Sequence, residues 1–277
     1  MDKKLNILIA YPYMKPDVID MLHKNEDKIR FVLDSGAFTA WKAGSEIKVM
    51  DYCNFIKSLP FKPWNYFMLD KIGDPEGTKE NYKIMLSEGL NPIPIFTRGE
   101  EITSLDEFFN TSEIVGLGGL VGTQGNKGFV KGIMERVGDR KVHWLGFIEK
   151  NFIAHYKPFM CDSSSWSGGV RYGRMDLYMG NGKWTGLVKK DFMKMPPKHI
   201  YDRICFYGEK PEKLAFQKEW VNSGVPLLAL IPMKSWIHYS FEVRKRFGTQ
   251  LFLAVASTTD LRNFLKCYDE LMASGII

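Results

Sequence analysis

Cysteine is scarce in this sequence. The 277 residues include four cysteines, Cys53, Cys161, Cys205 and Cys267, which lie far apart. None of them belongs to a Cys-x-x-Cys pair or to a cluster with histidine, so the pattern indicates neither a zinc site nor a disulfide framework. We expect buried free thiols, and no metal ion or other cofactor.

Long apolar runs are also missing. No run approaches the roughly 18 to 20 residues that a membrane-spanning helix needs. The first residues, "MDKKLNILIAYPYMKPD", have too short an apolar core for a signal peptide and no small-residue cleavage site. The sequence therefore predicts a cytoplasmic protein with no membrane partner.

The chain contains no low-complexity tract, no short repeat and no linker rich in Pro, Gly or Ser. With 45% hydrophobic and 25% charged residues, it can bury a large core. We expect a single domain over residues 1–277, in which residues 163–203 form a basic and aromatic insertion.

Short apolar runs recur along the chain, each followed by a turn and usually by a helix-like stretch. Their near-continuous apolar character is typical of parallel strands that are buried on both faces of a sheet. Seven strand–helix units predict an α/β fold of the (β/α)8 barrel type. A doubly wound open sheet is the alternative, although no G-x-G-x-x-G loop follows the first strand. The runs are "NILIAY", "FVLDSG", "YFMLDK", "PIPIFTRG", "IVGLGGLVG", "VHWLGFI" and "FMCDSSS".

Helical spacing between these strands predicts helices at "VMDYCNFIKSL", "TKENYKIMLSEG" and "GFVKGIMERVG". Two segments qualify as the eighth strand, "VPLLALIP" and "QLFLAVAST". We favour the second, because "TTDLRNFLKCYDELMASG" follows it as a closing helix with Thr or Asp near its cap.

The formal charge of +6 is concentrated in one segment. Residues 163–203 contain eight Lys and Arg against three Asp, and so carry +5. Aromatic residues are interleaved with these charges, a combination that suits phosphate neutralisation and base stacking. A solvated basic hairpin with aromatic core anchors is the alternative. The candidates for nucleic-acid contact are Arg171, Arg174, Lys189, Lys190, Trp166 and Tyr172.

Three aspartates end predicted strands: Asp34 in "VLDSG", Asp70 in "MLDKIGD" and Asp162 in "MCDSSS". A single Asp at such a place often caps a helix or makes an Asx-turn. In a barrel, however, the C-terminal strand ends line the active site. Carboxylates brought together there acquire different pKa values and can divide nucleophile and acid/base roles.

These motifs resemble those of a known family. "LDSGAF" resembles the Asp-Ser-Gly-Gly-Phe motif of the tRNA-guanine transglycosylase superfamily, "YFMLDK" its base-reading strand, and "VGLGGLVG" its glycine loop beneath the purine. "VHWLGF" and "MCDSSSWSGGVRYGR" look like the strand pair that leads to its nucleophilic Asp. The resemblance is ordered and covers roughly residues 30 to 175.

The resemblance implies a pentosyltransferase that exchanges guanine for a 7-deazaguanine. Asp162 would attack C1′, and Asp34 would move protons to and from the bases. Asp70 would accept hydrogen bonds from the guanine edge, since an ionised carboxylate only accepts. His143 is expected to face the barrel interior or a helix, with substrate contact as the alternative. Further substrate-binding candidates are Ser35, Gly36, Arg98, Gly118, Gly119 and Leu120.

The sequence departs from the tRNA enzymes of the family. The Cys-rich zinc insert is missing, and Thr97 and Arg98 occupy the region of a base-reading Gln. The chain is more similar to the phage-type DNA 7-deazaguanine transglycosylases, which act in the host cytoplasm. The expected partners are DNA rather than tRNA and a free 7-deazaguanine base, with a homodimer left open. An N-glycosidase and a non-catalytic nucleic-acid-binding barrel are the alternatives.

Overall fold

The computed structural model describes residues 3–123, 127–188, 196–212 and 227–277. It divides into two compact units. The first, called the sheet unit here, comprises Asp2–Ser163 and Phe247–Thr258. The second, the C-terminal unit, comprises Ser164–Arg246 and Thr259–Ile277. The expectation of a single domain, with an insertion over residues 163–203, stays a prediction.

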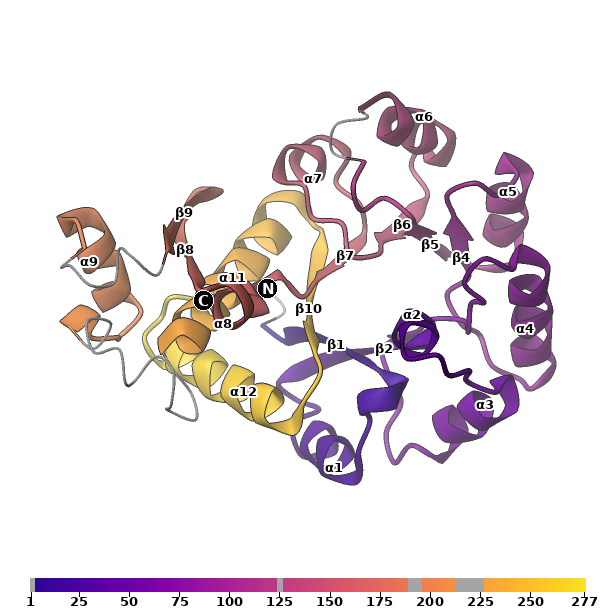
Figure 1. The fold of residues 1–277 in the computed structure, drawn as a ribbon, viewed down its shortest axis with the longest axis horizontal. Coiled ribbons are helices and arrows are strands. Elements are labelled where there is room, and N and C mark those ends of the chain that lie inside the picture. Colours follow the sequence, from indigo (N-terminus) through magenta and orange to yellow (C-terminus); the bar gives the residue numbers. More distant parts are fainter. Residues whose placement is uncertain (1–2, 124–126, 189–195, 213–226) are drawn as a thin grey trace. The chain divides into compact units, whose positions relative to one another are not determined.

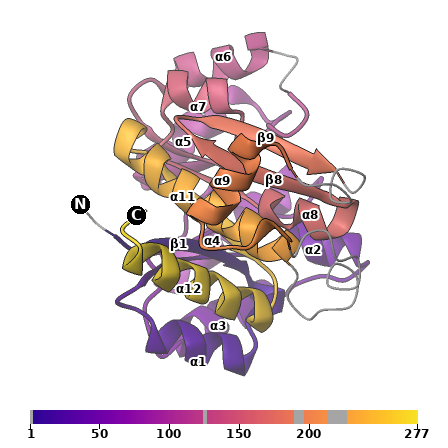
Figure 2. The ribbon, with the colours of Figure 1, turned by 90° about the vertical axis from the view of Figure 1, so that its left-hand side faces the viewer.

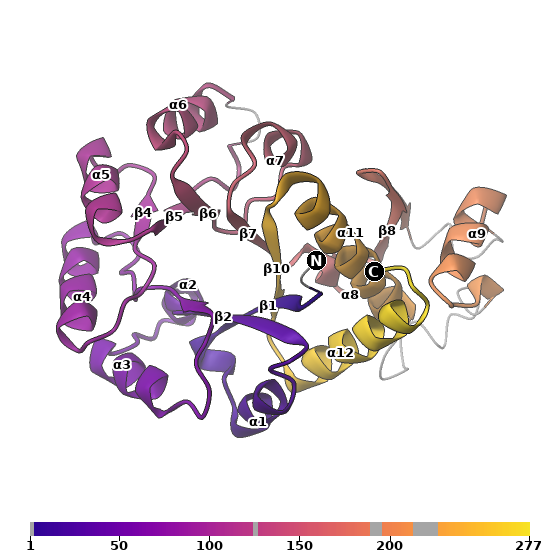
Figure 3. The ribbon, with the colours of Figure 1, turned by 180° about the vertical axis from the view of Figure 1, so that it is seen from behind.

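A curled, all-parallel sheet forms the centre of the sheet unit (Figure 1). The strands follow the hydrogen-bonded order β3, β2, β1, β10, β7, β6, β5 and β4. Figure 3 shows the part of this succession from β2 to β4 from behind. The apolar runs of the sequence produce these strands, and all six residues of β1 are buried. The strands are β1 (Leu5–Ala10), β2 (Ile29–Asp34), β3 (Asn65–Tyr66), β4 (Ile95–Thr97), β5 (Ile114–Gly118), β6 (Lys141–Trp144), β7 (Met160–Ser163) and β10 (Gln250–Val255).

Helices of the same unit flank the sheet in Figure 1, and the three predicted between the first seven strands are confirmed as α3, α4 and α6. The start of α4 illustrates why: Asp74 accepts a hydrogen bond from the Gly77 N–H, and Pro75 occupies the first helical position. The elements are the 3-10 helix η1 (Tyr11–Tyr13), α1 (Pro16–Lys24), α2 (Ala37–Lys42), α3 (Val49–Ser58), α4 (Pro75–Ser87), α5 (Ile102–Thr111), α6 (Lys127–Val137) and α7 (Lys150–Tyr156).

The two ends of the strand order, β3 and β4, meet at Ile93. This residue pairs in parallel with Phe67 as an isolated bridge. Its N–H donates to the Tyr66 carbonyl at 2.8 Å, and its carbonyl accepts from the Met68 N–H at 2.9 Å. Pro94 follows and has no N–H to donate, so the regular strand β4 begins only at Ile95.

The eighth strand is β10, within "QLFLAVAST", as predicted. It pairs with both β1 and β7. The described part of the competing segment "VPLLALIP" belongs instead to helix α11 (Leu227–Phe247). The predicted closing helix is α12 (Thr258–Ala273).

The C-terminal unit contains an antiparallel hairpin, which Figure 2 shows. The ring of Tyr178 is buried and packs against Trp184. Among the described residues, no helix combines the length and the apolar character needed to cross a bilayer. The remaining elements are the 3-10 helix η2 (Ser165–Ser167), α8 (Gly168–Tyr172), β8 (Arg174–Gly180), β9 (Lys183–Val188) and α9 (Lys198–Phe206).

Candidate functional site

The three candidate aspartates follow strands of the sheet unit. Asp34 is the last residue of β2, Asp162 is the third residue of β7, and Asp70 comes four residues after β3. Because the strands are parallel, their carboxyl ends lie at the same edge of the sheet. The charges of Asp70 and Asp162 are close enough to act on Asp34. The structure therefore brings the three carboxylates together, as the sequence predicts.

Asp34 has the most perturbed acidity of the three. Burial raises its pKa to about 7, and the charges of Asp70 and Asp162 add to the increase. The Gly36 N–H donates to Asp34 Oδ2 at 3.0 Å, which opposes the shift without cancelling it. Asp34 can therefore hold a proton near neutral pH and release it there.

Gly36 forms the turn that fixes Asp34. Its φ of 75° is left-handed, a conformation that favours glycine. A Cβ atom at this position would also lie 2.3 Å from Cδ of Pro12, in the turn after β1. The turn thus depends on a glycine for two separate reasons.

Ser35 connects the Asp34 turn with Asp70. Its hydroxyl donates to Asp70 Oδ1 at 3.1 Å and accepts from the Ala37 N–H at 3.3 Å. The side chain of Ser35 is almost fully buried. Burial raises the pKa of Asp70, and the Ser35 hydrogen bond opposes that shift. Ser35 therefore orients the Asp70 carboxylate, leaving its second oxygen without this contact.

Two nitrogen atoms lie within hydrogen-bond distance of the same carboxylate oxygen of Asp162. The Gly146 N–H donates to Asp162 Oδ1 at 2.8 Å, and His143 Nε2 lies 2.9 Å from the same oxygen. His143 is fully buried in β6 and faces this carboxylate. The sequence predicts an interior position for His143, with substrate contact as the alternative, but not its contact with Asp162, which depends on the register of β6 against β7.

Two more titratable groups belong to this edge. Tyr52 of α3 is fully buried and donates to the Phe67 carbonyl at 3.1 Å. Burial and then the charge of Asp34 raise its pKa well above the usual value. Glu100 accepts from the Thr97 N–H at 2.9 Å, and its pKa is raised by burial, with a smaller effect of Asp70. Sequence reasoning missed both, although Glu100 follows β4 directly in "TRGE".

The glycine loop after β5 packs against the end of β4. The Arg98 N–H donates to the Gly118 carbonyl at 3.3 Å. Gly119 has a φ of 72°, and a Cβ there would lie 2.7 Å from Cβ of Arg98. Leu120 is buried, whereas the Arg98 guanidinium lies over the ring of Phe129 at 4.8 Å. The backbone of Arg98 is thus part of this loop region, while its guanidinium packs on α6.

An exposed aromatic pair directly follows the Asp34 turn. Phe38 and Trp41 on α2 are 54% and 56% exposed, and their rings stack 5.9 Å apart. The ammonium group of Lys42 lies 4.4 Å from the centre of the Phe38 ring. Exposed aromatic faces beside a cation suit nucleobases and phosphates. Sequence reasoning missed this pair, because short helix α2 has no clear apolar periodicity.

The basic segment lies in the C-terminal unit. Tyr172 is 81% exposed, whereas Trp166 is buried and packs edge-on against Phe264. Trp166 therefore has the core placement that the sequence left open. Arg174 is exposed and pairs with Asp176 at 2.9 Å. Lys189, Lys190 and the side chain of Arg171 lie outside the described residues.

The described residues contain no group of three or more His, Cys, Asp or Glu side chains arranged to hold a metal ion. Of the four cysteines, three are buried and Cys205 is exposed, and all are free thiols. The expectation of buried thiols is thus confirmed for Cys53, Cys161 and Cys267. It is wrong for Cys205, which is exposed on the short helix α9.

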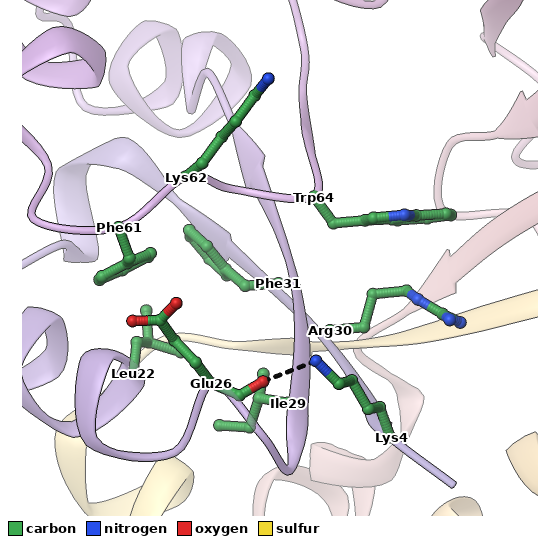
Figure 4. Close-up of a pocket in the computed structure, with 9 residues that line it drawn as sticks. All are labelled: Lys4, Leu22, Glu26, Ile29, Arg30, Phe31, Phe61, Lys62 and Trp64. Atoms are coloured by element: carbon green, nitrogen blue, oxygen red, sulfur yellow. Dashed lines mark hydrogen bonds between the residues drawn. The ribbon is translucent and has the colours of Figure 1, made fainter. Parts of the chain in front are cut away.

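A separate cavity of about 330 Å³ lies at the opposite, N-terminal end of β2 (Figure 4). Two of the three cations that line it, Lys4 and Arg30, have partners within the chain. Lys4 donates to the Glu26 carbonyl at 2.8 Å. Arg30 donates to Gln250 at 2.7 Å and lies over the ring of Trp64. This cavity is remote from the carboxylates along the strand, and its polar groups connect β1, β2 and β10.

No family model, curated protein or solved structure matches this chain. The three aspartates and their neighbours are therefore the basis on which a function can be assigned.

Proposed function

We propose that this chain is a base-exchange transglycosylase, which replaces guanine in a polynucleotide, DNA rather than tRNA, by a 7-deazaguanine base. The observation that carries the proposal is the meeting of Asp34, Asp70 and Asp162 at one edge of a parallel sheet. Asp34 has a pKa of about 7, while Asp162 is oriented by two hydrogen-bonding nitrogens. A proton carrier beside an oriented carboxylate is the pair that double displacement at a sugar requires.

The proposal includes a closed (β/α)8 barrel with a basic insertion after its seventh strand. The backbone hydrogen bonds of Ile93 to residues 66 and 68 support closure, because they connect the two ends of the strand order. In such a barrel the carboxyl ends of the strands form the active-site face. All three aspartates follow this rule.

In the first displacement, an oxygen of Asp162 forms a bond to C1′ of the target nucleotide while the bond from C1′ to the guanine nitrogen breaks. The electron pair of that bond goes to the base, which takes the proton of Asp34. The incoming base then returns a proton to Asp34, and its nitrogen attacks C1′ as the Asp162 carboxylate leaves. Two inversions retain the configuration of the sugar.

Asp70 is proposed to read the base. Its carboxylate is oriented by Ser35, and in the ionised form it accepts hydrogen bonds from the N1–H and exocyclic amine of guanine. Adenine offers an acceptor at N1 and is rejected. The backbone of Gly118, Gly119 and Leu120 would approach the opposite base edge, where a side chain has no space.

The target base must leave the stack to reach these groups, so the substrate is single-stranded, locally melted or flipped. Phe38 and Trp41 are suited to stack on flanking bases, because their rings are exposed next to the Asp34 turn. Tyr172 and the basic residues Arg171, Arg174, Lys189 and Lys190 are proposed to contact the flanking strand.

One experiment separates this function from its alternatives. A labelled single-stranded oligonucleotide containing guanine is incubated with the protein, with and without free 7-deazaguanine base. Incorporation of the added base supports exchange. Abasic product without incorporation indicates an N-glycosidase, and binding without either product indicates a non-catalytic protein; each of these outcomes overturns the proposal.

The covalent step gives a sharper prediction. Asp162→Ala should abolish any denaturant-resistant adduct between protein and oligonucleotide, because no carboxylate remains to bond to C1′. Binding should change by less than about threefold. The adduct is measured on denaturing gels and by intact mass, with Asp139→Ala, an exposed Asp in a turn, as the matched control. An adduct that persists in the Asp162 variant would refute the assignment.

A further inference from the structure

His143 is a buried polar side chain with one satisfied and one unsatisfied nitrogen. Its Nε2 lies 2.9 Å from Asp162 Oδ1, whereas Nδ1 is buried and has no hydrogen-bond partner among the described residues. The imidazole packs edge-on against the ring of Phe67, with centroids 4.8 Å apart. Burying the Nδ1 atom without a hydrogen-bond partner costs free energy, which the fold accepts at this position.

The strand register explains how His143 reaches Asp162. His143 of β6 pairs with Met160 of β7, and Asp162 comes two residues after Met160. Because side chains alternate along a strand, positions 160 and 162 face the same side of the sheet. His143 and Asp162 are therefore diagonal neighbours on one face, and the contact is built into the two strands.

The surroundings of the ring decide its tautomer. A proton on Nδ1 would create a buried N–H with no acceptor among the described residues. A proton on Nε2 points at Asp162 Oδ1, which also accepts from the Gly146 N–H. The favoured form is thus an imidazole that carries its proton on Nε2 and donates it to the carboxylate.

We propose that His143 is the positioning residue for Asp162: its Nε2–H and the Gly146 N–H together hold Oδ1, so that Oδ2 is the oxygen presented to C1′. The reactive part of this statement rests on the proposed function, whereas the hydrogen bond itself does not. Two donors on one oxygen fix the rotation of the carboxylate about its Cβ–Cγ bond.

The hydrogen bond is tested without any substrate. The sequence has five histidines, and ¹⁵N labelling of their rings with a His143→Gln spectrum assigns the His143 signals. We expect the Nε2–H tautomer and an Nε2 proton that exchanges slowly with water. In Asp162→Ala, this proton should exchange faster or shift, because its acceptor is gone. A proton on Nδ1, or an Nε2 signal unaffected by Asp162→Ala, would overturn the proposal even if the protein is a transglycosylase.

The positioning effect is tested on adduct formation with saturating guanine-containing oligonucleotide. His143→Gln keeps a side-chain N–H donor and should stay within about threefold of the parent rate. His143→Phe keeps the aromatic packing without a donor and should be about 10- to 100-fold slower, the range for losing a hydrogen bond to a charged group. Oligonucleotide affinity should be unchanged in both variants.

Equal rates in the Gln and Phe variants would refute positioning, provided that thermal unfolding shows both to be folded. If the Phe variant does not fold, a rate for His143→Gln more than tenfold below the parent rate would refute it equally. Absence of any adduct in the parent protein counts against the proposed function alone, since the ring spectra still decide the hydrogen bond.

Discussion

Asp34 is a carboxyl group whose charge is costly in the folded state. It is surrounded by protein, and the charges of Asp70 and Asp162 act on it unfavourably. A pKa of about 7 places its titration in the range where many enzymes work. The same residue therefore links the stability of the fold to the acid/base chemistry proposed for the site.

The contribution of Asp34 to the stability of the protein should fall as the pH rises from about 4 to 7. The folded-state pKa of Asp34 is raised from 3.8 to about 7, so the folded state binds more protons than the unfolded state in this window. This contribution to the free energy of unfolding then decreases with pH and levels off only above the folded-state pKa of about 7. The upper limit is roughly 4 kcal/mol, and residual contact of Asp34 with water reduces it.

Asp34→Asn removes this titration. The free energy of unfolding is measured in urea between pH 4 and 8. The difference between the variant and the parent should shift in favour of the variant as the pH rises. Asp139→Asn, at an exposed turn, serves as the control and should run parallel to the parent. A constant difference between Asp34→Asn and the parent across this pH range would contradict the raised pKa.

At this scale, the sequence was sufficient to predict that the three aspartates share one edge, since each lies close to the carboxyl end of a strand and the strands are parallel. It was not sufficient to predict the partner of Asp162. That contact depends on the register of β6 against β7, which is set by packing of the whole sheet. Exposure of Phe38 and Trp41 likewise depends on the placement of α2, which a six-residue helix does not reveal in its periodicity.

At the scale of the element, the connection from β2 to α2 depends on Gly36. The chain turns there with a left-handed φ, and Pro12 of η1 occupies the space where a side chain would stand. The Asp34 carboxylate accepts the N–H of the same glycine. Gly36 therefore packs against the turn after β1 and also holds the Asp34 carboxylate at the end of β2.

Gly36→Ala should lower the free energy of unfolding by about 2 to 4 kcal/mol, because it adds a steric clash with Pro12 to the cost of a positive φ. Gly44→Ala is the matched control. Gly44 also has a positive φ, of 67°, but nothing lies within 4 Å of its added Cβ. It should cost only about 1 to 2 kcal/mol. Equal losses in urea unfolding would show that Pro12 does not constrain the turn.

Strand and helix positions were predictable because the apolar runs match strands and the 3.6-residue period matches helices. The eighth strand was the ambiguous element. "VPLLALIP" is as apolar as "QLFLAVAST", and its described residues nevertheless belong to α11, where Pro232 lies inside the helix. Composition alone does not separate a buried helix from a buried strand, and only the closing helix α12 favoured the correct choice.

At the scale of the whole molecule, charge is distributed unevenly along the chain. Residues 163–203 carry +5 of the formal +6. A polynucleotide releases counterions when such a segment neutralises its phosphates, so affinity then depends steeply on salt. The charge pattern therefore makes a prediction that is independent of the catalytic residues.

Replacing Arg171, Arg174, Lys189 and Lys190 by Ala should make the plot of log affinity against log salt shallower, by roughly 0.7 for each phosphate that the protein no longer neutralises. The effect should be the same for different base sequences. The control removes the same charge from exposed helix positions of the sheet unit, Lys24, Lys57, Lys83 and Lys131. If both quadruple variants keep the slope of the parent, the basic segment is only a solvated surface.

The isolated bridge between Phe67 and Ile93 is a place where we expect the sheet to open locally. Between β3 and the segment before β4, the only backbone hydrogen bonds among the described residues are the two that Ile93 makes with Tyr66 and Met68. Asp70 lies two residues after Met68 in the sequence. Local opening occurs where few backbone bonds must break together. Amide deuterium exchange at Met68 and Ile93 should therefore be faster than at Leu8 and Val32, which lie within the continuous ladder of β1 and β2. In the proposed exchange reaction, local opening at this bridge would give the edge that holds Asp70 room to admit one planar base and release another.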